Sequence, residues 1–132
     1  MFYCLVVGSR DFEDYRLLEN ALDKLLRYHE EITIVTGGAK GADTLAEKYA
    51  ASRGYNCIVM KADWSRYGKG AGILRNEQMH AYIARYENRG CVAFWNGKSK
   101  GTYSNFELAR KYNNALRIIR TDRKPVRSEP SR

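Results

Sequence analysis

The chain has 132 residues, of which 44% are hydrophobic and 12% aromatic, and 23 Lys or Arg against 15 Asp or Glu give a formal net charge of +8. This length predicts one domain, and this composition excludes a disordered chain. No apolar run approaches the roughly 18–20 residues of a membrane span, so we expect no membrane partner.

Five short apolar runs alternate with amphipathic stretches. The runs predict strands at 2–7, 32–36, 56–60, 91–95 and 116–120, and their near-continuous hydrophobicity is typical of strands buried on both faces of a parallel sheet. Apolar side chains recur at helical spacing at 14–29, 42–50, about 70–86 and 103–114. This alternation predicts an α/β fold, a three-layer, doubly wound parallel sheet of about five strands and four helices.

The positive charge is concentrated in the second half of the chain. Residues 1–60 hold 7 basic and 9 acidic groups, whereas residues 61–132 hold 16 basic and 6 acidic ones. We expect a folded domain at 1–120 and a basic, flexible tail at 121–132. A basic half indicates a phosphate-bearing or polyanionic partner, either a nucleotide or a nucleic acid.

The cysteines and histidines give no sign of a disulfide or metal framework. Cys4, Cys57 and Cys91 are odd in number and lie in apolar runs, which predicts reduced core residues in a cytoplasmic protein without a signal peptide. No two cysteines have ligand spacing, and neither His29 nor His80 has a nearby partner. We therefore expect no metal and no cofactor.

Ligands of such sheets bind at the carboxyl ends of the strands, where this chain places glycine-rich loops. Glycines let the backbone approach a ligand, and a helix N-terminus adds about half a positive charge, as phosphate binding requires. The alternative is a tight turn with Asp43 or Thr44 as N-cap and a capping box at 44–47. The candidate ligand-binding residues after the first two strands are Gly8, Ser9, Arg10, Gly37, Gly38, Ala39, Lys40, Gly41 and Asp43.

A second candidate anion site follows the fourth strand. Its residues are Gly97, Lys98, Ser99, Gly101 and Thr102. The alternative is a plain loop before a helix whose capping box is formed by Ser104 and Glu107. Two such loops on neighbouring strands favour binding.

The polar, glycine-rich segment at 63–72 has the composition expected of a lid over a nucleobase or sugar. Asp63 ends the third predicted strand, where dinucleotide-binding folds place the residue that contacts the ribose. Trp64 is a candidate for stacking on a base, and Arg75 is a candidate for a bidentate hydrogen bond to a carboxylate or phosphate. The alternative, equally open, makes Trp64 a core residue and Arg75 a surface charge.

Five segments in order resemble a known family. Val-Val-Gly-Ser-Arg-Asp-Phe (6–12), Thr-Gly-Gly-Ala-Lys-Gly-Ala-Asp (36–43), Ala-Asp-Trp (62–64), Ala-Gly-Ile-Leu-Arg-Asn-Glu-Gln-Met (71–79) and Trp-Asn-Gly-Lys-Ser-Lys-Gly-Thr (95–102) resemble the YspA/cpYpsA-related branch of the SLOG superfamily. That superfamily also groups the Smf/DprA DNA-processing proteins and the Lonely Guy (LOG) phosphoribohydrolases. The resemblance spans about residues 2–120. It implies a Rossmann-like fold whose glycine loops hold a nucleotide or nucleotide-derived ligand, in a homo-oligomer encoded by a bacterium or phage.

The resemblance to LOG enzymes, which cleave the N-glycosidic bond of nucleoside monophosphates, is incomplete. In their Arg-Lys-x-x-Met motif the Lys is replaced here by Asn76, which we include among the ligand-binding candidates. The carboxylate expected three residues after Thr102 is replaced by Asn105, and Glu107 lies two residues further on. The remaining catalytic candidates are Arg75, Glu107 and Asp43.

These observations lead to one favoured function and two alternatives. The favoured one is a binder of a nucleotide-derived small molecule that acts as a sensor or a sequestering protein. The first alternative is an N-glycosidase acting on a nucleoside monophosphate, and the second is binding of single-stranded nucleic acid through the basic half.

Overall fold

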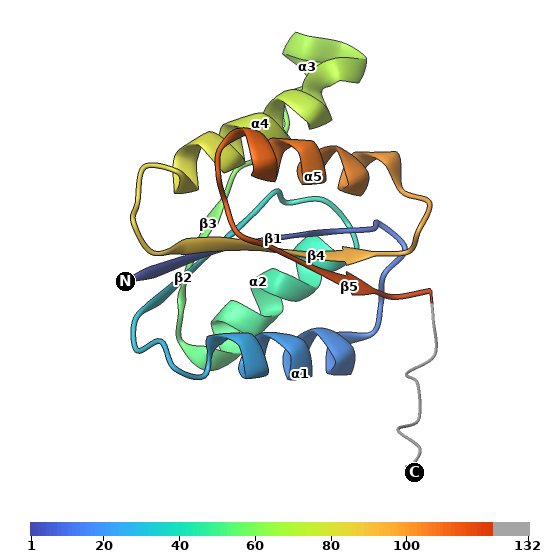
Figure 1. Ribbon diagram of the computed structural model, residues 1–132. Coiled ribbons are helices and arrows are strands. Elements are labelled where there is room, and N and C mark those ends of the chain that lie inside the picture. The colour runs from blue at the N-terminus through green and yellow to red at the C-terminus, as the bar shows by residue number, and fades with distance from the viewer. Residues whose placement is uncertain (123–132) are drawn as a thin grey trace.

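The computed structural model describes residues 1–122 and contains one parallel sheet. The predicted tail at 121–132 lies outside the described residues except for its first two positions. The strand order is β3-β2-β1-β4-β5, with β1 in the centre (Figure 1). The strands are β1 (Phe2–Gly8), β2 (Ile32–Thr36), β3 (Asn56–Val59), β4 (Arg89–Trp95) and β5 (Leu116–Arg120).

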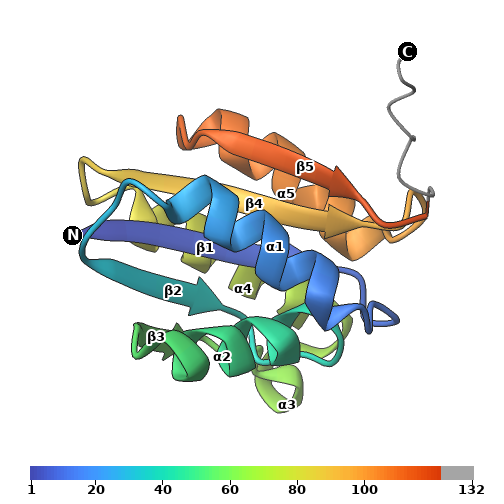
Figure 2. The same ribbon diagram turned by 90° about the horizontal axis from the view of Figure 1, so that it is seen from below.

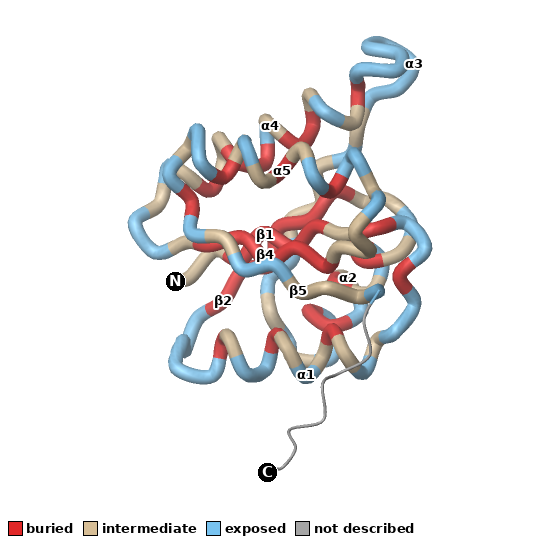
Figure 3. Tube along the Cα trace, turned by 45° about the vertical axis from the view of Figure 1, so that its right-hand side comes forward, coloured by how far each residue is buried: buried red, intermediate tan, exposed pale blue. Residues whose placement is uncertain are grey.

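Four long helices cover the two faces of the sheet. The helices α1 (Tyr15–Leu26) and α2 (Ala42–Arg53) lie on one face, and α4 (Ala71–Ile83) and α5 (Lys100–Lys111) lie on the other (Figures 1 and 2). The predicted three-layer, doubly wound α/β fold is therefore confirmed. The sequence did not predict the one-turn helix α3 (Trp64–Tyr67) or the 3₁₀ turn η1 (Gly68–Gly70), which project beyond the sheet and bury no residue (Figure 3).

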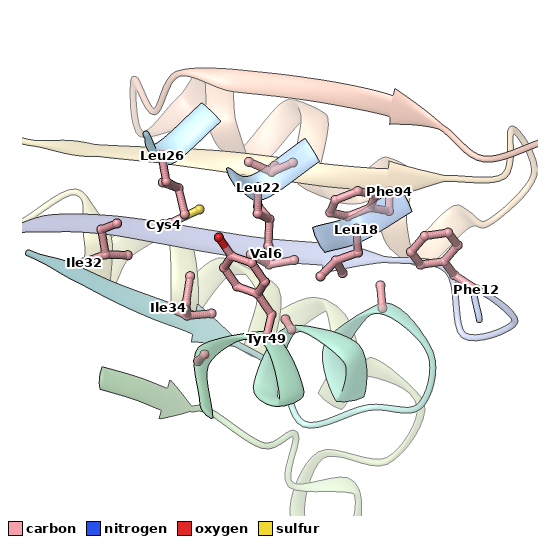
Figure 4. Packing of buried hydrophobic residues seen from close by; sticks show 14 residues of the cluster. Cys4, Val6, Phe12, Leu18, Leu22, Leu26, Ile32, Ile34, Tyr49 and Phe94 are labelled. Carbon is pink, nitrogen blue, oxygen red and sulfur yellow. The ribbon is translucent and has the colours of Figure 1, made fainter. Parts of the chain in front are cut away.

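The face under α1 and α2 holds the larger hydrophobic core. Leu18, Leu22 and Leu26 recur every four residues along α1 and point at the strands (Figure 4). Tyr49 of α2 packs among them with its ring fully buried. Aliphatic side chains on one helical stripe therefore fix this layer, as the hydrophobic spacing of the sequence predicted.

The face under α4 and α5 has a smaller apolar cluster and a set of buried polar residues. Met79 and Ile83 pack on Leu5, Val7 and Ala93 of the strands. The same layer buries six polar side chains, Arg75, Asn76, His80, Thr102, Asn105 and Asn114.

One helix start and the caps of two helices differ from what the sequence suggested. Helix α5 begins at Lys100, three residues before the expected start, because the hydroxyl of Ser99 caps it by accepting a bond from the Thr102 amide at 3.2 Å. The predicted capping box of Ser104 and Glu107 therefore lies inside the helix and is wrong. Helix α2 begins at Ala42 as expected but has no side-chain cap after Gly41, so the alternative that Asp43 or Thr44 is its N-cap is wrong as well.

The edge strands β3 and β5 differ from the prediction of strands buried on both faces. Their residues are exposed or half-buried, because no strand pairs with the outer edge of either one among the described residues. Cys57 on β3 is exposed, so its predicted place in the core is wrong, whereas Cys4 and Cys91 are buried and all three are free thiols. Burial raises the pKa of the Cys4 thiol to about 12. None of the helices described in residues 1–122 is both long and apolar enough to cross a membrane.

Candidate functional site

A cleft of about 220 Å³ opens at the carboxyl end of β1, bordered by residues that follow β2 and β4. The neighbouring strands β1 and β4 mark the point where the strand order reverses, because the chain runs from β1 outward to β3 and then returns to β4 on the other side of β1. Ligands of open α/β sheets bind at such a switch point. The walls of the cleft come from the loop after β1, the glycine loop after β2, α3 with η1, α4, and the first turns of α5.

Arg75 on α4 carries its guanidinium group into this cleft. The residue is only 9% exposed, so the alternative of a surface charge is wrong. Its Nη1 donates to the carbonyl oxygen of Gly37 at 2.5 Å, and its Nε donates to Oδ1 of Asn76 at 2.9 Å. Burial is the main cause that lowers the pKa of Arg75, and the charge of Asp43 opposes it.

Gly37 is a glycine because Arg75 packs directly against it. A Cβ at this position would lie 2.5 Å from Nη1 of Arg75 and 2.9 Å from Oδ2 of Asp43. No side chain fits into that space without moving the guanidinium group. The glycine of this loop therefore positions a cation, a role that the sequence did not distinguish from direct phosphate contact.

Asp43, near the start of α2, is the one carboxylate among the residues that line the cleft. Its Oδ2 accepts a bond from the Ala39 amide at 3.2 Å, which holds the glycine loop. Burial raises the pKa of Asp43, and its bond from Ala39 and the charge of Arg75 oppose that rise. Asp43 and Arg75 therefore form a buried pair of opposite charges side by side without a direct salt bridge in the described structure.

Ser9 and Gly41 join the loops around the cleft. The Ser9 carbonyl accepts bonds from the amides of Phe12 and Ala42, and its hydroxyl accepts one from the Asn96 amide at 3.2 Å. Gly41 has a φ of +79°, and a Cβ there would collide with the carbonyl oxygens of Ser9 and Arg10. Both residues therefore hold the cleft walls together and do not line the cleft themselves.

Trp64 and Arg10 form one side of the cleft mouth. Trp64 is 49% exposed, so the alternative of a core residue is wrong. The guanidinium carbon of Arg10 lies 5.8 Å from the centroid of the Trp64 ring, within cation–π range. An exposed indole and a cation thus meet at the opening, and Lys69 of η1 is a further cation of the cleft lining.

Residues of the loop after β4 line two different depressions. Oδ1 of Asn96 accepts bonds from the amides of Lys98 and Ser99, both at 2.8 Å, in a tight turn through Gly97, whose φ is +82°. Ser99, Gly101 and Thr102 then enter the cleft, whereas Lys98 lies in a separate depression with Asp11 and Glu13.

Ten of the eighteen residues proposed for ligand binding line the cleft. They are Gly8, Arg10, Ala39, Asp43, Trp64, Arg75, Asn76, Ser99, Gly101 and Thr102. The other eight lie outside the lining, namely Ser9, Gly37, Gly38, Lys40, Gly41, Asp63, Gly97 and Lys98. Asp63 is the N-cap of α3, where its Oδ1 accepts from the Arg66 amide at 3.2 Å. Of the catalytic candidates, Arg75 and Asp43 line the cleft and Glu107 is exposed on α5 outside it.

Six lining residues were missed by sequence reasoning. They are Val7, Lys69, Gly72, Ile73, Met79 and Asn105. Four of them stand in segments that carried the family resemblance, and Asn105 stands where a carboxylate was sought, so all five had a signal. Lys69 had none beyond its place in the polar segment at 63–72. Among residues 1–122 no group of His, Cys, Asp and Glu side chains is arranged to hold a metal ion.

Comparison with known proteins places the chain in a family. Residues 4–67 match the family described as the YspA, cpYpsA-related SLOG family. The Gene 61 protein of Mycobacterium phage D29 is 37% identical over 113 residues, which cover 81% of this chain and 87% of that protein. The chain belongs to the YspA/cpYpsA-related SLOG family. The resemblance noted in the sequence is thereby confirmed, and a phage protein is among its relatives.

This SLOG protein is also similar, at low identity, to a solved structure. It is a crystal structure described as a predicted subunit of tRNA methyltransferase from Methanocaldococcus jannaschii DSM. The two chains are 18% identical with a TM-score of 0.43, over 92% of this chain and 69% of that one.

Proposed function

We propose that this protein binds a nucleotide or nucleotide-derived small molecule in the cleft at the carboxyl end of β1, and that it acts as a sensor or a sequestering protein. The observation that carries the proposal is the buried guanidinium group of Arg75 in the cleft wall. SLOG-family membership and the α/β fold are compatible with such a ligand. The phage relative supports a phage or bacterial setting.

The cleft has cations for an anionic group. Arg75 uses Nη1 and Nε within the protein, and no acceptor bonds its Nη2 in the part of the chain that the structure describes. Buried donors are rarely left without an acceptor, and charge-assisted bonds to phosphate are among the strongest that guanidinium forms. Arg10 and Lys69 add two further cations to the lining. A phosphate or carboxylate in the cleft would complete this arrangement.

The mouth of the cleft has an aromatic surface for a base. Trp64 leaves half of its side chain exposed at the opening, with Arg10 over its ring. Stacking of a base on an aromatic side chain contributes about 1–3 kcal/mol. The volume of about 220 Å³ lies below that of most small-molecule sites, which span about 300–1,000 Å³. A compact ligand fits this size better than a nucleic-acid strand does.

The experiment that tests the proposal combines identification and binding. Native mass spectrometry of the purified protein, followed by denaturation, would reveal a co-purified small molecule, and a thermal-shift panel of nucleotides would find its class. A nucleotide at 100 times its dissociation constant is expected to stabilise the protein by about 2.7 kcal/mol. The variant Arg75→Gln is expected to abolish this shift, whereas Lys98→Gln, a cation outside the lining, is expected to retain it. Absence of any shift and of any bound molecule would overturn the proposal.

The N-glycosidase function is a second candidate because of Asp43. This carboxylate lines the cleft, and its burial raises its pKa, which is the direction expected of a group that donates or accepts a proton in catalysis. Incubation with nucleoside monophosphates followed by chromatography of the free base tests it. Base release that Asp43→Asn abolishes would support the enzyme, and intact nucleotides after prolonged incubation would exclude it.

A further inference from the structure

A chain of buried polar side chains leads away from the cleft between α4 and α5. It begins at Asn105, which lines the cleft, and its next member is His80, whose side chain is 0% exposed. Nε2 of His80 lies 3.1 Å from Oδ1 of Asn105, and Nδ1 lies 3.0 Å from Nδ2 of Asn114. The half-buried Arg89 is the last member of this series of hydrogen bonds, with its Nε 2.6 Å from Oδ1 of Asn114. The bonds therefore join the cleft to the opposite end of the sheet.

The donor and the acceptor of each hydrogen bond in this series can be assigned from its last member, Arg89. Arg89 has only donors, so the atom of Asn114 that faces it is the carbonyl oxygen, and the amide nitrogen of Asn114 faces His80. That nitrogen also donates to the carbonyl of His80 at 3.2 Å, which supports the same orientation. Nδ1 of His80 is then an acceptor.

The proton of the neutral imidazole is thereby placed on Nε2. Burial lowers the pKa of His80 to about 4, so the ring is neutral at pH 7. A neutral ring that accepts at Nδ1 donates from Nε2, here to Oδ1 of Asn105. The amide nitrogen of Asn105 in turn donates to the carbonyl oxygens of Gly101 and Thr102, both at 3.3 Å.

The bonds end on the turn of α5 that forms a wall of the cleft. The Gly101 carbonyl also accepts from Nδ2 of Asn76 at 3.3 Å and from the Ser104 hydroxyl at 2.7 Å. Asn76 is the same residue whose Oδ1 accepts from Arg75. Helix α4 therefore holds the first turn of α5 at two levels one helical turn apart, through Asn76 and through His80.

We propose that His80 is a positioning residue of the cleft, which fixes the carboxamide of Asn105 and through it the first turn of α5. Arg89 and Asn114 serve to hold the imidazole in the tautomer that donates toward the cleft. The part of this inference that concerns affinity rests on the proposed function, whereas the part that concerns the α5 turn does not.

Two substitutions separate the two sides of the ring. In His80→Gln the amide nitrogen of the new side chain takes the place of Nε2, so the variant still donates a hydrogen bond to Asn105. In His80→Asn the carbonyl oxygen of the new side chain takes the place of Nδ1, so this variant still accepts from Asn114 but no longer donates to Asn105. Both remove the ring and leave a neutral carboxamide. A merely structural role of His80 predicts equal behaviour of the two variants at equal stability.

The first measurement needs no ligand. Hydrogen exchange of the Tyr103 amide, which bonds to the Ser99 carbonyl at 3.1 Å, reports on the first turn of α5. We expect exchange about tenfold faster in His80→Asn than in His80→Gln, since loss of a bond to a buried group loosens the turn it holds. The amide of Val6 in the central strand serves as the control. Equal Tyr103 rates in the two variants would overturn the proposal.

The second measurement uses adenosine 5′-monophosphate as the probe. Titration calorimetry is expected to show affinity within about threefold of the unaltered protein for His80→Gln and a loss of about tenfold for His80→Asn. No binding to the unaltered protein would count against the proposed function for this probe, and the exchange rates would still decide the positioning role. If neither variant folds, ¹⁵N shifts of the unaltered imidazole decide, because protonated Nε2 supports the proposal and protonated Nδ1 overturns it.

Discussion

The helices on one face of the sheet carry leucines and a tyrosine into the interior, whereas those on the other face carry an arginine, asparagines and a histidine. Full burial of an aliphatic side chain stabilises a fold by about 1.5–3 kcal/mol, while a buried polar group costs free energy unless it is hydrogen-bonded. The polar groups under α4 and α5 are bonded to one another across the two helices. The α1/α2 face therefore contributes most of the stability, and the α4/α5 face uses part of its interior to hold the cleft.

The largest effect on stability is expected on the α1/α2 face. Leu22→Ala is expected to lower the free energy of unfolding by about 2–5 kcal/mol, because it removes a fully buried side chain from the larger core. Urea unfolding measures this. The affinity of the folded variant for its nucleotide is expected to stay unchanged, and Leu25→Ala on a half-buried position is expected to cost less. A loss of affinity in folded Leu22→Ala would show that the two faces are not separate.

Low pH is expected to lower the free energy of unfolding through a residue of the α4/α5 face, His80. The pKa of His80 is about 4 in the folded protein and about 6.5 in an unfolded chain, so the unfolded state takes up the proton first as the pH falls. Stability is then lost between pH 6.5 and pH 4, by about 2 kcal/mol at pH 5 relative to pH 7.5.

Urea unfolding at the two pH values measures this loss, and His80→Gln should remove it. The buried carboxyl of Asp43, whose pKa is raised, acts in the opposite direction, so the comparison with the variant isolates the contribution of His80. An unchanged pH dependence in His80→Gln would refute the assignment.

A smaller effect, on binding and not on folding, is expected at Gly37. The new methyl group of Gly37→Ala meets Nη1 of Arg75 at 2.5 Å and displaces the guanidinium group from its place in the cleft. We expect about a tenfold loss of affinity, equal to about 1.4 kcal/mol, for the nucleotide found by screening. Calorimetry measures it. Gly70→Ala is the matched control, since a Cβ there meets nothing within 4 Å, and equal affinities in the two variants would contradict the positioning role of Gly37.

The smallest effect is expected from a polar bond on the α1/α2 face. The hydroxyl of Tyr49 donates to Oδ1 of Asp23 at 2.6 Å at the outer side of that core. Tyr49→Phe removes this bond and keeps the ring, so we expect a loss of about 1 kcal/mol in the free energy of unfolding and no change in binding. A loss as large as that of Leu22→Ala would mean that this face also depends on polar bonds.

Most of the fold could be predicted from the sequence because strand and helix periods alternate without ambiguity. The exposure of β3 and Cys57 could not, since an apolar run of four or five residues does not reveal whether its strand lies in the centre or at the edge. The start of α5 was missed because Lys100 and Gly101 have the composition of a loop, although the Ser99 hydroxyl caps a helix there.

The candidate site was predictable in outline because every strand of a parallel sheet ends at the same edge. Which charged side chains enter the cleft could not be predicted from the sequence, because this depends on the conformation of individual turns. Lys98 and Ser99 are neighbours, yet the turn around Asn96 sends one outward and the other into the cleft. The burial of Arg75 depends on a contact with Gly37, 38 residues away in the chain.

The half-exposed indole at the cleft mouth also provides a built-in optical signal. The chain has two tryptophans, and Trp95 lies away from the opening, in contact with the rings of Tyr103 and Phe106. In a Trp95→Phe variant the emission at long wavelength would come from Trp64 alone. A base that stacks on this ring would quench its fluorescence, so occupancy of the cleft becomes readable in unlabelled protein.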